Sequence, residues 1–251
     1  MNRLFFYTVL PLTLLLCWEI LSRSGVLDYR FYPAPSSIFS YLIFDSINDN
    51  ILHDISASLF RVFWGLLIGA SLGLCAGIAM GLIPIVKRLC FPLVAISYPI
   101  PKIAILPLIM LIFGLGELSK IVVVAIGAFF LVLMNTLQGV ESINKQYFDI
   151  ARVFSFSRKD VIFKIVLPGA GPAILTGLRL AVGYSLVIVV AAEFSGADAG
   201  IGYIIWQSWE TFSIKTMYAG IFIISALGFT FAILLDLIEK VFLNWKEKNT
   251  R

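Results

Sequence analysis

The chain has 251 residues, of which 60% are hydrophobic and only 14% charged, and its mean hydropathy is +0.96. Soluble domains are about 45–50% apolar and about 25% charged, so this composition excludes an ordinary soluble protein and indicates a membrane protein. The net charge of +4 does not point to nucleic acid, because in a membrane protein the distribution of Lys and Arg among the loops matters more than their sum.

Six apolar runs are candidates for membrane-spanning helices, which need about 20 residues each. They cover residues 4–21, 59–80, 91–113, 121–136, 173–194 and 217–243. The first run follows Arg3 as a secretory signal would, but no small-residue cleavage site follows it, so we expect an uncleaved span. We predict an all-α polytopic membrane protein with six transmembrane helices, in which residues 1–251 form one domain and about 58–243 hold five core spans.

Lys and Arg are distributed unequally between the two sides of these spans. One side holds twelve of the nineteen and the other holds four, while Arg61, Lys102 and Arg179 lie inside spans or at their ends. Loops on the cytoplasmic side of a membrane carry the excess of Lys and Arg. We therefore expect a multi-pass plasma-membrane protein with both termini, and the loop at about 140–171, in the cytoplasm.

The second run contains glycines at strict steps of four residues: Gly65, Gly69, Gly73, Gly77 and Gly81. Small residues at this spacing let helix backbones approach closely, so they mark a packing seam. The seam could lie inside one subunit or could contact a second copy, which would make a homodimer.

The third run is interrupted by prolines at positions 92, 99, 101 and 107, and each removes a backbone donor. Lys102 lies beside Pro101, and a lysine at the bilayer centre costs about 2.5–3.5 kcal/mol. Lys102 therefore either reaches an interface or a partner from a kinked helix, or it lines a break in a translocation path together with Pro101.

The fifth run carries Arg179 and Glu193, fourteen residues apart and so about 21 Å along a helix. They cannot pair with each other, and each lies near a different membrane face. Each side chain could bind near its own interface or could help to form the translocation path.

The loop at 147–168 has the spacing of two short helices. Tyr147, Ile150, Ala151 and Phe154 predict an apolar stripe on the first helix, and residues 155–157 predict a turn. Ser157 followed by Asp160 resembles a capping box that begins the second helix. We expect prolines 168 and 172 to end that helix.

This loop could lie on anionic lipid, merely connect two spans, or imitate a DNA-binding helix-turn-helix. A role as a docking element for a cytoplasmic protein explains more features of this loop. Phe154 and Phe156 at the turn would be aromatic anchors, and Arg152 and Arg158 would lie at the rim.

Motifs for chemistry are absent from the sequence. It contains no phosphate-binding G-x-x-x-x-G-K-[ST] segment, and His53 is its single histidine. We therefore expect neither catalytic residues nor a bound cofactor or metal.

The loop also resembles the signature of permease subunits of ATP-binding-cassette (ABC) importers, which reads E-A-A, three residues, G, nine residues, I-x-L-P. Asp149, Ile150 and Ala151 occupy the first three positions, Ser155 takes the place of the glycine, and residues 165–168 read I-V-L-P. A turn that needs positive φ is easier for glycine than for serine.

Further blocks, such as "YPAPSSIF", "PIPKIAILPLIMLIFGLGELSK" and "GIGYIIW", are similar to importer permeases of the nitrate, sulfonate and taurine type. The resemblance implies a type I importer fold, a pair of permeases, two cytoplasmic ATPases that hydrolyse ATP, and an extracytoplasmic solute-binding protein. It implies as solute a sulfonate, nitrate, taurine or a vitamin precursor. It also implies that the loop couples to the ATPase, with candidate residues Asp149, Ala151, Arg152, Phe154, Ser155, Phe156, Arg158, Ile165, Leu167 and Pro168.

Two other classes compete with this one. A membrane-embedded lipid hydrolase needs a convergent nucleophile or metal set, which the sequence does not suggest. A transporter driven by an ion gradient is normally built from inverted repeats, and we find no internal repeat.

Overall fold

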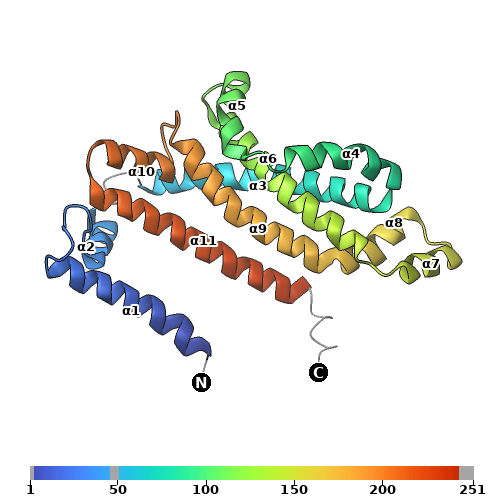
Figure 1. The fold of residues 1–251 in the computed structure, drawn as a ribbon, viewed down its shortest axis with the longest axis horizontal. Coiled ribbons are helices and arrows are strands. Elements are labelled where there is room, and N and C mark those ends of the chain that lie inside the picture. The colour runs from blue at the N-terminus through green and yellow to red at the C-terminus, as the bar shows by residue number, and fades with distance from the viewer. Residues whose placement is uncertain (1–2, 46–50, 243–251) are drawn as a thin grey trace.

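The computed structural model describes residues 3–45 and 51–242, and every regular element in these ranges is helical (Figure 1). The α-helices are α1 (Arg3–Arg23), α2 (Pro35–Ser40), α3 (Ile51–Leu82), α4 (Pro84–Ser97), α5 (Leu106–Phe113), α6 (Glu117–Glu141), α7 (Lys145–Val153), α8 (Arg158–Val161), α9 (Leu167–Glu193), α10 (Ile201–Glu210) and α11 (Ile214–Phe242). The other helical turns are η1 (Tyr41–Asp45), η3 (Lys102–Ile105) and η4 (Ile162–Val166). The prediction of an all-α protein is confirmed.

Four of the described helices are long and apolar enough to cross a membrane: Ile51–Leu82, Glu117–Glu141, Arg158–Glu193 and Ile214–Val241. The pair Pro84–Ser97 and Lys102–Phe113 would make a fifth span, although its halves are bent by 88°. The predicted first span falls on α1, and the side chains of residues 1–8 lie outside the described part of the chain.

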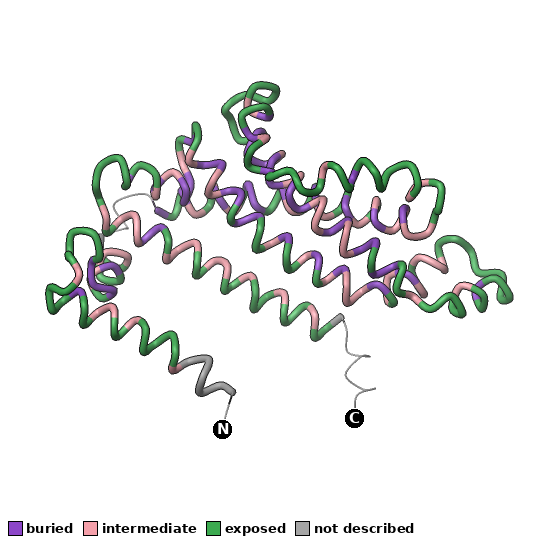
Figure 2. The backbone as a smooth tube through the Cα atoms, in the orientation of Figure 1, coloured by how far each residue is buried: buried purple, intermediate pink, exposed green. Residues whose placement is uncertain are grey.

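The core of the bundle is formed by α3, α6 and α9, with α6 packed between the other two (Figures 1 and 2). Half of the apolar window of α6 is buried, whereas none of the window of α11 is. The α1–α2 segment rests on α11 through aromatic contacts, such as Trp18 with Tyr218 at 5.4 Å and Phe39 with Phe222 at 5.1 Å between ring centroids. The bundle therefore has a tight three-helix centre and a loosely attached edge.

The five glycines of the second run all face α6 of the same chain. A Cβ atom on Gly69 would lie 2.2 Å from the carbonyl oxygen of Ala125, and one on Gly73 would lie 2.6 Å from that of Phe129. No side chain fits at such distances, so the α3 and α6 backbones approach as closely as glycine allows.

The third run is broken where its prolines cluster. Helix α4 ends at Ser97, the chain turns through residues 98–101, and η3 leads into α5 at a steep angle. Helix α5 stands away from the bundle in Figure 1, and Leu111 on it is 83% exposed.

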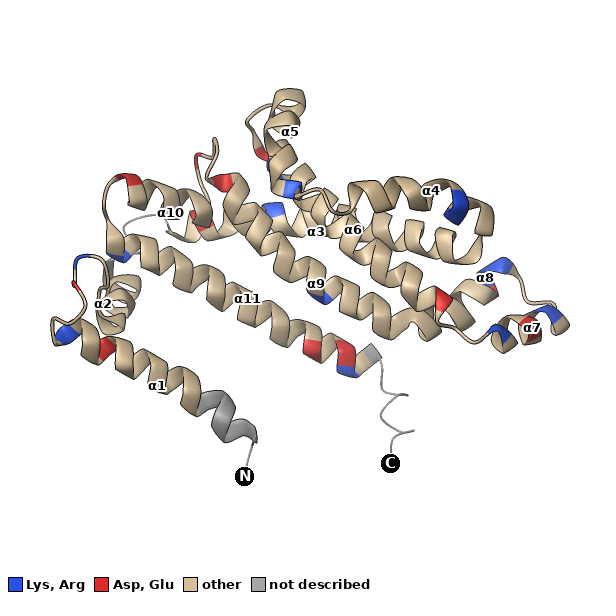
Figure 3. Cartoon of the chain, viewed as in Figure 1, with Lys and Arg blue, Asp and Glu red and all other residues tan. Residues whose placement is uncertain are grey.

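Charged residues lie at both ends of the bundle and at the α1–α2 connection, and a few lie within the bundle and near the end of α11 (Figure 3). One end carries α7 and α8, and the opposite end carries α10 (Figure 1). We refer to them as the α7–α8 end and the α10 end.

Candidate functional site

At the α7–α8 end, a tight turn closes α7. The amide of Phe156 donates to the carbonyl of Ala151 at 2.9 Å, and the amide of Ser155 donates to that of Arg152 at 3.1 Å. This pair of bonds is a Schellman motif, which requires a left-handed residue between helix and turn. Ser155 supplies it with φ of 51°, at a cost of about 1–2 kcal/mol for an L-residue. Serine therefore adopts the conformation for which the family signature has glycine.

The next helix begins at the predicted cap. The Oγ atom of Ser157 accepts a hydrogen bond from the amide of Asp160 at 3.2 Å and donates to its carboxylate at 2.6 Å. Asp160 then pairs with Lys164 at 2.6 Å. These contacts fix the direction in which α8 leaves the turn.

The prediction that prolines end this second helix is wrong. Helix α8 passes through the π-helical turn η4 into α9, so one helix runs from Arg158 to Glu193. A π turn shifts the hydrogen-bond register by one residue, and Pro168 directly follows it in the first turn of α9. Proline has no backbone N–H, so at this position it leaves no amide without a partner, and the helix continues.

The tip of this helix–turn–helix element presents apolar side chains to solvent. Val153 and Phe154 are 81% and 70% exposed, and Phe156 is 38% exposed. The charges beside them form surface pairs only, such as Arg152 with Asp149 at 3.0 Å. The sequence placed Phe154 on the same apolar stripe as Ala151, but only Ala151 is buried.

The opposite side of the element is anchored in the bundle. Phe148 and Val161 pack against a cluster formed by Val140, Val166 and neighbouring residues of α6 and α9. A groove of about 900 Å³ separates α7 from the ends of α3 and α6. The element is therefore fixed at its base and exposed at its tip.

Lys102 lies at the break in the third run and is 5% exposed. Its Nζ atom donates to the carbonyls of Ser97 and Tyr98 at 2.6 and 3.1 Å and lies 4.1 Å from the centroid of the Phe130 ring. Pro101 precedes it as the N-cap of η3. The ammonium group therefore binds the backbone carbonyls that the end of α4 leaves free.

Arg179 links α9 to α11 near the end of the latter helix. Its guanidinium pairs with the carboxylates of Asp236 and Glu239, the second at 2.8 Å. The side chain of Arg179 is 46% exposed, so this contact lies at the surface of the single chain.

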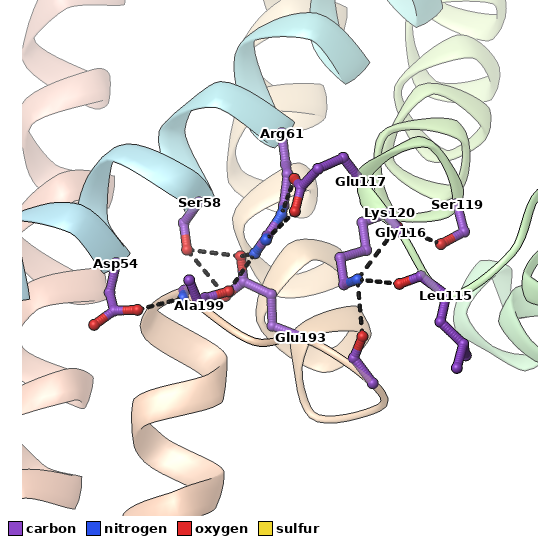
Figure 4. A network of polar contacts seen from close by, with 12 residues as sticks. Asp54, Ser58, Arg61, Leu115, Gly116, Glu117, Ser119, Lys120, Glu193 and Ala199 are labelled. Atoms are coloured by element: carbon purple, nitrogen blue, oxygen red, sulfur yellow. Dashed lines mark hydrogen bonds and ion pairs between the residues drawn. The ribbon is translucent and has the colours of Figure 1, made fainter.

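An ion-pair network centred on two buried side chains occupies the α10 end (Figure 4). Arg61 of α3 donates to Glu193 of α9 at 2.6 Å, to both carboxylate oxygens of Glu117 of α6 at 2.6 Å, and to the carbonyl of Ala199 at 2.7 Å. Arg61 and Glu193 are each 1% exposed. One guanidinium thus joins the three core helices and the connector between α9 and α10.

The same network binds the start of α10. The amide of Gly200 donates to Asp54 at 2.7 Å, that of Ile201 to Ser58 at 2.9 Å, and the next amide to Glu193 at 2.8 Å. The first amides of a helix have no partners within it, so oxygen atoms from α3 and α9 satisfy them here.

Lys120 extends the network to the connector before α6. Its buried ammonium donates to the carbonyls of Leu115, Gly116 and Gly196 at 2.7, 3.3 and 3.1 Å. Lys120 therefore binds both connectors, at 114–116 and at 194–200, and Arg61 binds the second one through Ala199.

The path candidates from the sequence do not converge in the single chain. Pro101 and Lys102 lie at the break, Arg179 faces α11, and Glu193 belongs to the α10-end network. The pairing of Glu193 with Arg61, and of Arg61 with Glu117, was not predicted from the sequence. A signal was present, because Arg61 lies four residues before Gly65 and Asp54 and Ser58 continue the same face.

The described residues contain no group of three or more His, Cys, Asp or Glu side chains that could hold a metal ion. The charged groups of the α10 end are paired with one another or with backbone carbonyls. This arrangement holds elements together.

Comparison with known proteins agrees with this fold. Residues 65–243 match the family described as "binding-protein-dependent transport system inner membrane component". The chain is 32% identical over 241 residues to the aliphatic sulfonates transport permease protein SsuC of Bacillus subtilis (strain 168), covering 95% of this chain and 86% of that protein. It is 31% identical over 237 residues to the taurine transport system permease protein TauC of Escherichia coli (strain K12), covering 92% and 86%.

A solved structure shows the same fold. A chain of the MetNI methionine ABC transporter in an inward facing conformation superimposes with a TM-score of 0.71, covering 80% of this chain and 99% of that one at 17% identity. The chain therefore belongs to the family of binding-protein-dependent inner membrane transport components. It is a permease subunit of an ABC importer and a multi-pass membrane protein, as the resemblance in the sequence implied.

Proposed function

We propose that this permease imports a sulfonate of the taurine type, delivered by an extracytoplasmic solute-binding protein and driven by separate cytoplasmic ATPases. The coupling of the permease to the ATPases is supported by the α7–α8 element, whose base is buried and whose Phe154 and Phe156 are exposed. The names of the relatives support the solute class.

The arrangement in the membrane is part of the same proposal. The 251 residues form one permease domain with six spans, the sixth supplied by α1, and two copies line the path. The α7–α8 end carries most of the Lys and Arg of the loops, so we place it and both termini in the cytoplasm.

The α7–α8 element would transmit ATPase closure to the spans. Phe154 would insert into a pocket of the ATPase, because an exposed aromatic with basic neighbours is typical of an interface anchor. Asp149, Ala151, Ser155 and the I-V-L-P segment at 165–168 would shape the element, and Arg152 and Arg158 would contact the partner at the rim.

A single substitution tests this role. Phe154→Asp should abolish co-purification of the ATPase and solute-stimulated ATP hydrolysis, since a carboxylate cannot enter an apolar pocket without a partner. The matched control is Phe31→Asp, an aromatic residue of similar exposure near the opposite end of the bundle, which should keep both. Unchanged ATPase binding in Phe154→Asp would refute the coupling role.

The solute and the energy source need a second experiment. The binding protein recovered with the gently purified complex should bind taurine or a related sulfonate in a ligand screen. Uptake of that sulfonate should stop on ATP depletion and continue when ion gradients are dissipated. Binding of a vitamin precursor or of nitrate instead would overturn the solute class alone.

A further inference from the structure

At the α10 end, two connectors far apart in sequence lie against each other. Residues 114–116 precede α6 and residues 194–200 precede α10. Both connectors are held by α3 and α6 side chains, since Lys120 binds a carbonyl of each and Arg61 binds Glu117, Glu193 and Ala199 (Figure 4).

Two buried cations, Arg61 and Lys120, lie in this cluster with the carboxylates of Asp54, Glu117 and Glu193. Arg61 pairs with both glutamates, and polar atoms of Ser58 and the connector backbones complete the hydrogen bonds. Separating the connectors would remove carbonyl partners from the buried ammonium of Lys120 and the carbonyl of Ala199 from Arg61, while the Arg61–Glu193 pair would stay intact. Removing partners from a buried cation is far more costly than separating a surface pair.

The two connectors approach each other closely at Gly196. A Cβ atom built on this glycine would lie 3.3 Å from a terminal carbon of Leu115 and 3.8 Å from its Cβ. Positions 115 and 196 are therefore near enough to be joined by a short cross-link.

We propose that this cluster is a permanent clamp, which keeps residues 114–117 and 194–202 fixed to α3 through every stage of transport. Arg61 is then a positioning residue that sets where α10 begins, and it does not take part in solute binding. The conformational change takes place elsewhere, in elements with less buried contact such as α11. This inference rests on the proposed import function.

A reversible cross-link tests the clamp. The native cysteines Cys17, Cys75 and Cys90 are first replaced by alanine, and Leu115→Cys and Gly196→Cys are then introduced together. The Cβ separation of 3.8 Å matches that of a disulfide, for which about 3.8 Å is the mean. A cysteine at position 196 takes the positive φ of 71° that Gly196 has, at a cost of about 1–2 kcal/mol. The double variant is reconstituted in vesicles with its ATPase and binding protein and is assayed for taurine uptake when reduced, oxidised and reduced again.

We expect oxidation to change the uptake rate by less than about twofold, which is a small change in an activation barrier. Uptake that is abolished by oxidation and restored by reduction would overturn the proposal, because it would show that the connectors separate during transport. The single variants Leu115→Cys and Gly196→Cys, oxidised in the same way, control for damage by the oxidant.

A second measurement needs no solute, so its result tests the clamp independently of the proposal that the solute is a sulfonate. Spin labels on Leu115 and the exposed Ser195 report the separation of the connectors in the permease–ATPase complex. The separation should be the same without nucleotide and with trapped ATP. A separation that changes between these states would refute the clamp whether or not the cross-linked variant folds.

Discussion

The two ends of the bundle use charged residues in opposite ways. At the α10 end, Arg61 and Glu193 are buried and joined at 2.6 Å, and their contacts cross three helices. At the α7–α8 end, Arg152 and Asp149 are exposed and pair within one short helix at 3.0 Å. The first arrangement fixes elements relative to one another, and the second leaves a surface free for another protein.

The largest expected difference between the ends is in stability. Glu193→Ala should lower the free energy of unfolding by about 3–5 kcal/mol, because it removes one partner of a buried ion pair. Asp149→Ala is the matched change at the other end and should cost about 0–1 kcal/mol, as surface pairs do. Chemical denaturation of both variants in detergent measures the values, and equal losses would show that the two ends do not differ as described.

The glycine seam should have the next largest effect. Gly69→Ala places a Cβ atom 2.2 Å from the carbonyl oxygen of Ala125, so α3 and α6 must move apart. We expect the free energy of unfolding to fall by about 1–3 kcal/mol. Gly183→Ala on α9 is the control, because nothing lies within 4 Å of the added atom. A thermal unfolding scan compares them, and similar melting temperatures would contradict the close packing of α3 on α6.

Lys102→Met tests whether Lys102 stabilises the broken third run, as Arg61 stabilises the α10 end, or lines a path for the solute. The substitution removes hydrogen bonds to two carbonyls and should lower stability by about 2 kcal/mol, since the donor is charged. We expect the affinity for solute in uptake assays to remain unchanged. An unchanged stability with a large loss of affinity would instead assign Lys102 to the path.

The smallest effect is expected at the turn after α7. Ser155→Gly should stabilise the loop by about 0.5–1 kcal/mol, because glycine adopts positive φ without the strain of a side chain. Ser157→Ala, two residues further on, removes the cap of α8 and should destabilise it by about 1 kcal/mol. Amide hydrogen exchange over residues 145–161 reads both effects, and the same sign for both would contradict the assigned geometry.

Local features were predictable from the sequence because local contacts determine them. The start of α8 at Ser157 depends on a hydrogen bond to Asp160, and the break near Pro101 follows from missing amides. The prolines at 168 and 172 misled the prediction, because the π turn that accommodates Pro168 leaves no clear pattern in the residues around it.

Long-range features were predictable only in part. The spacing of the glycines gives the buried face of α3 but not the helix that covers it. The α3 partners of Glu193, Ser58 and Arg61, lie more than 130 residues away in the sequence, and no periodicity within one helix reports such a contact. The angle of 88° between the halves of the third run likewise depends on packing around the break.

The continuous helix from Arg158 to Glu193 has a mechanical consequence. Its 36 residues correspond to a rod of about 54 Å at 1.5 Å per residue. One end of the rod follows Phe156, and the other end carries Glu193. Because no loop interrupts this helix, a force applied beside the exposed turn acts along the same continuous backbone that ends at the Arg61–Glu193 pair.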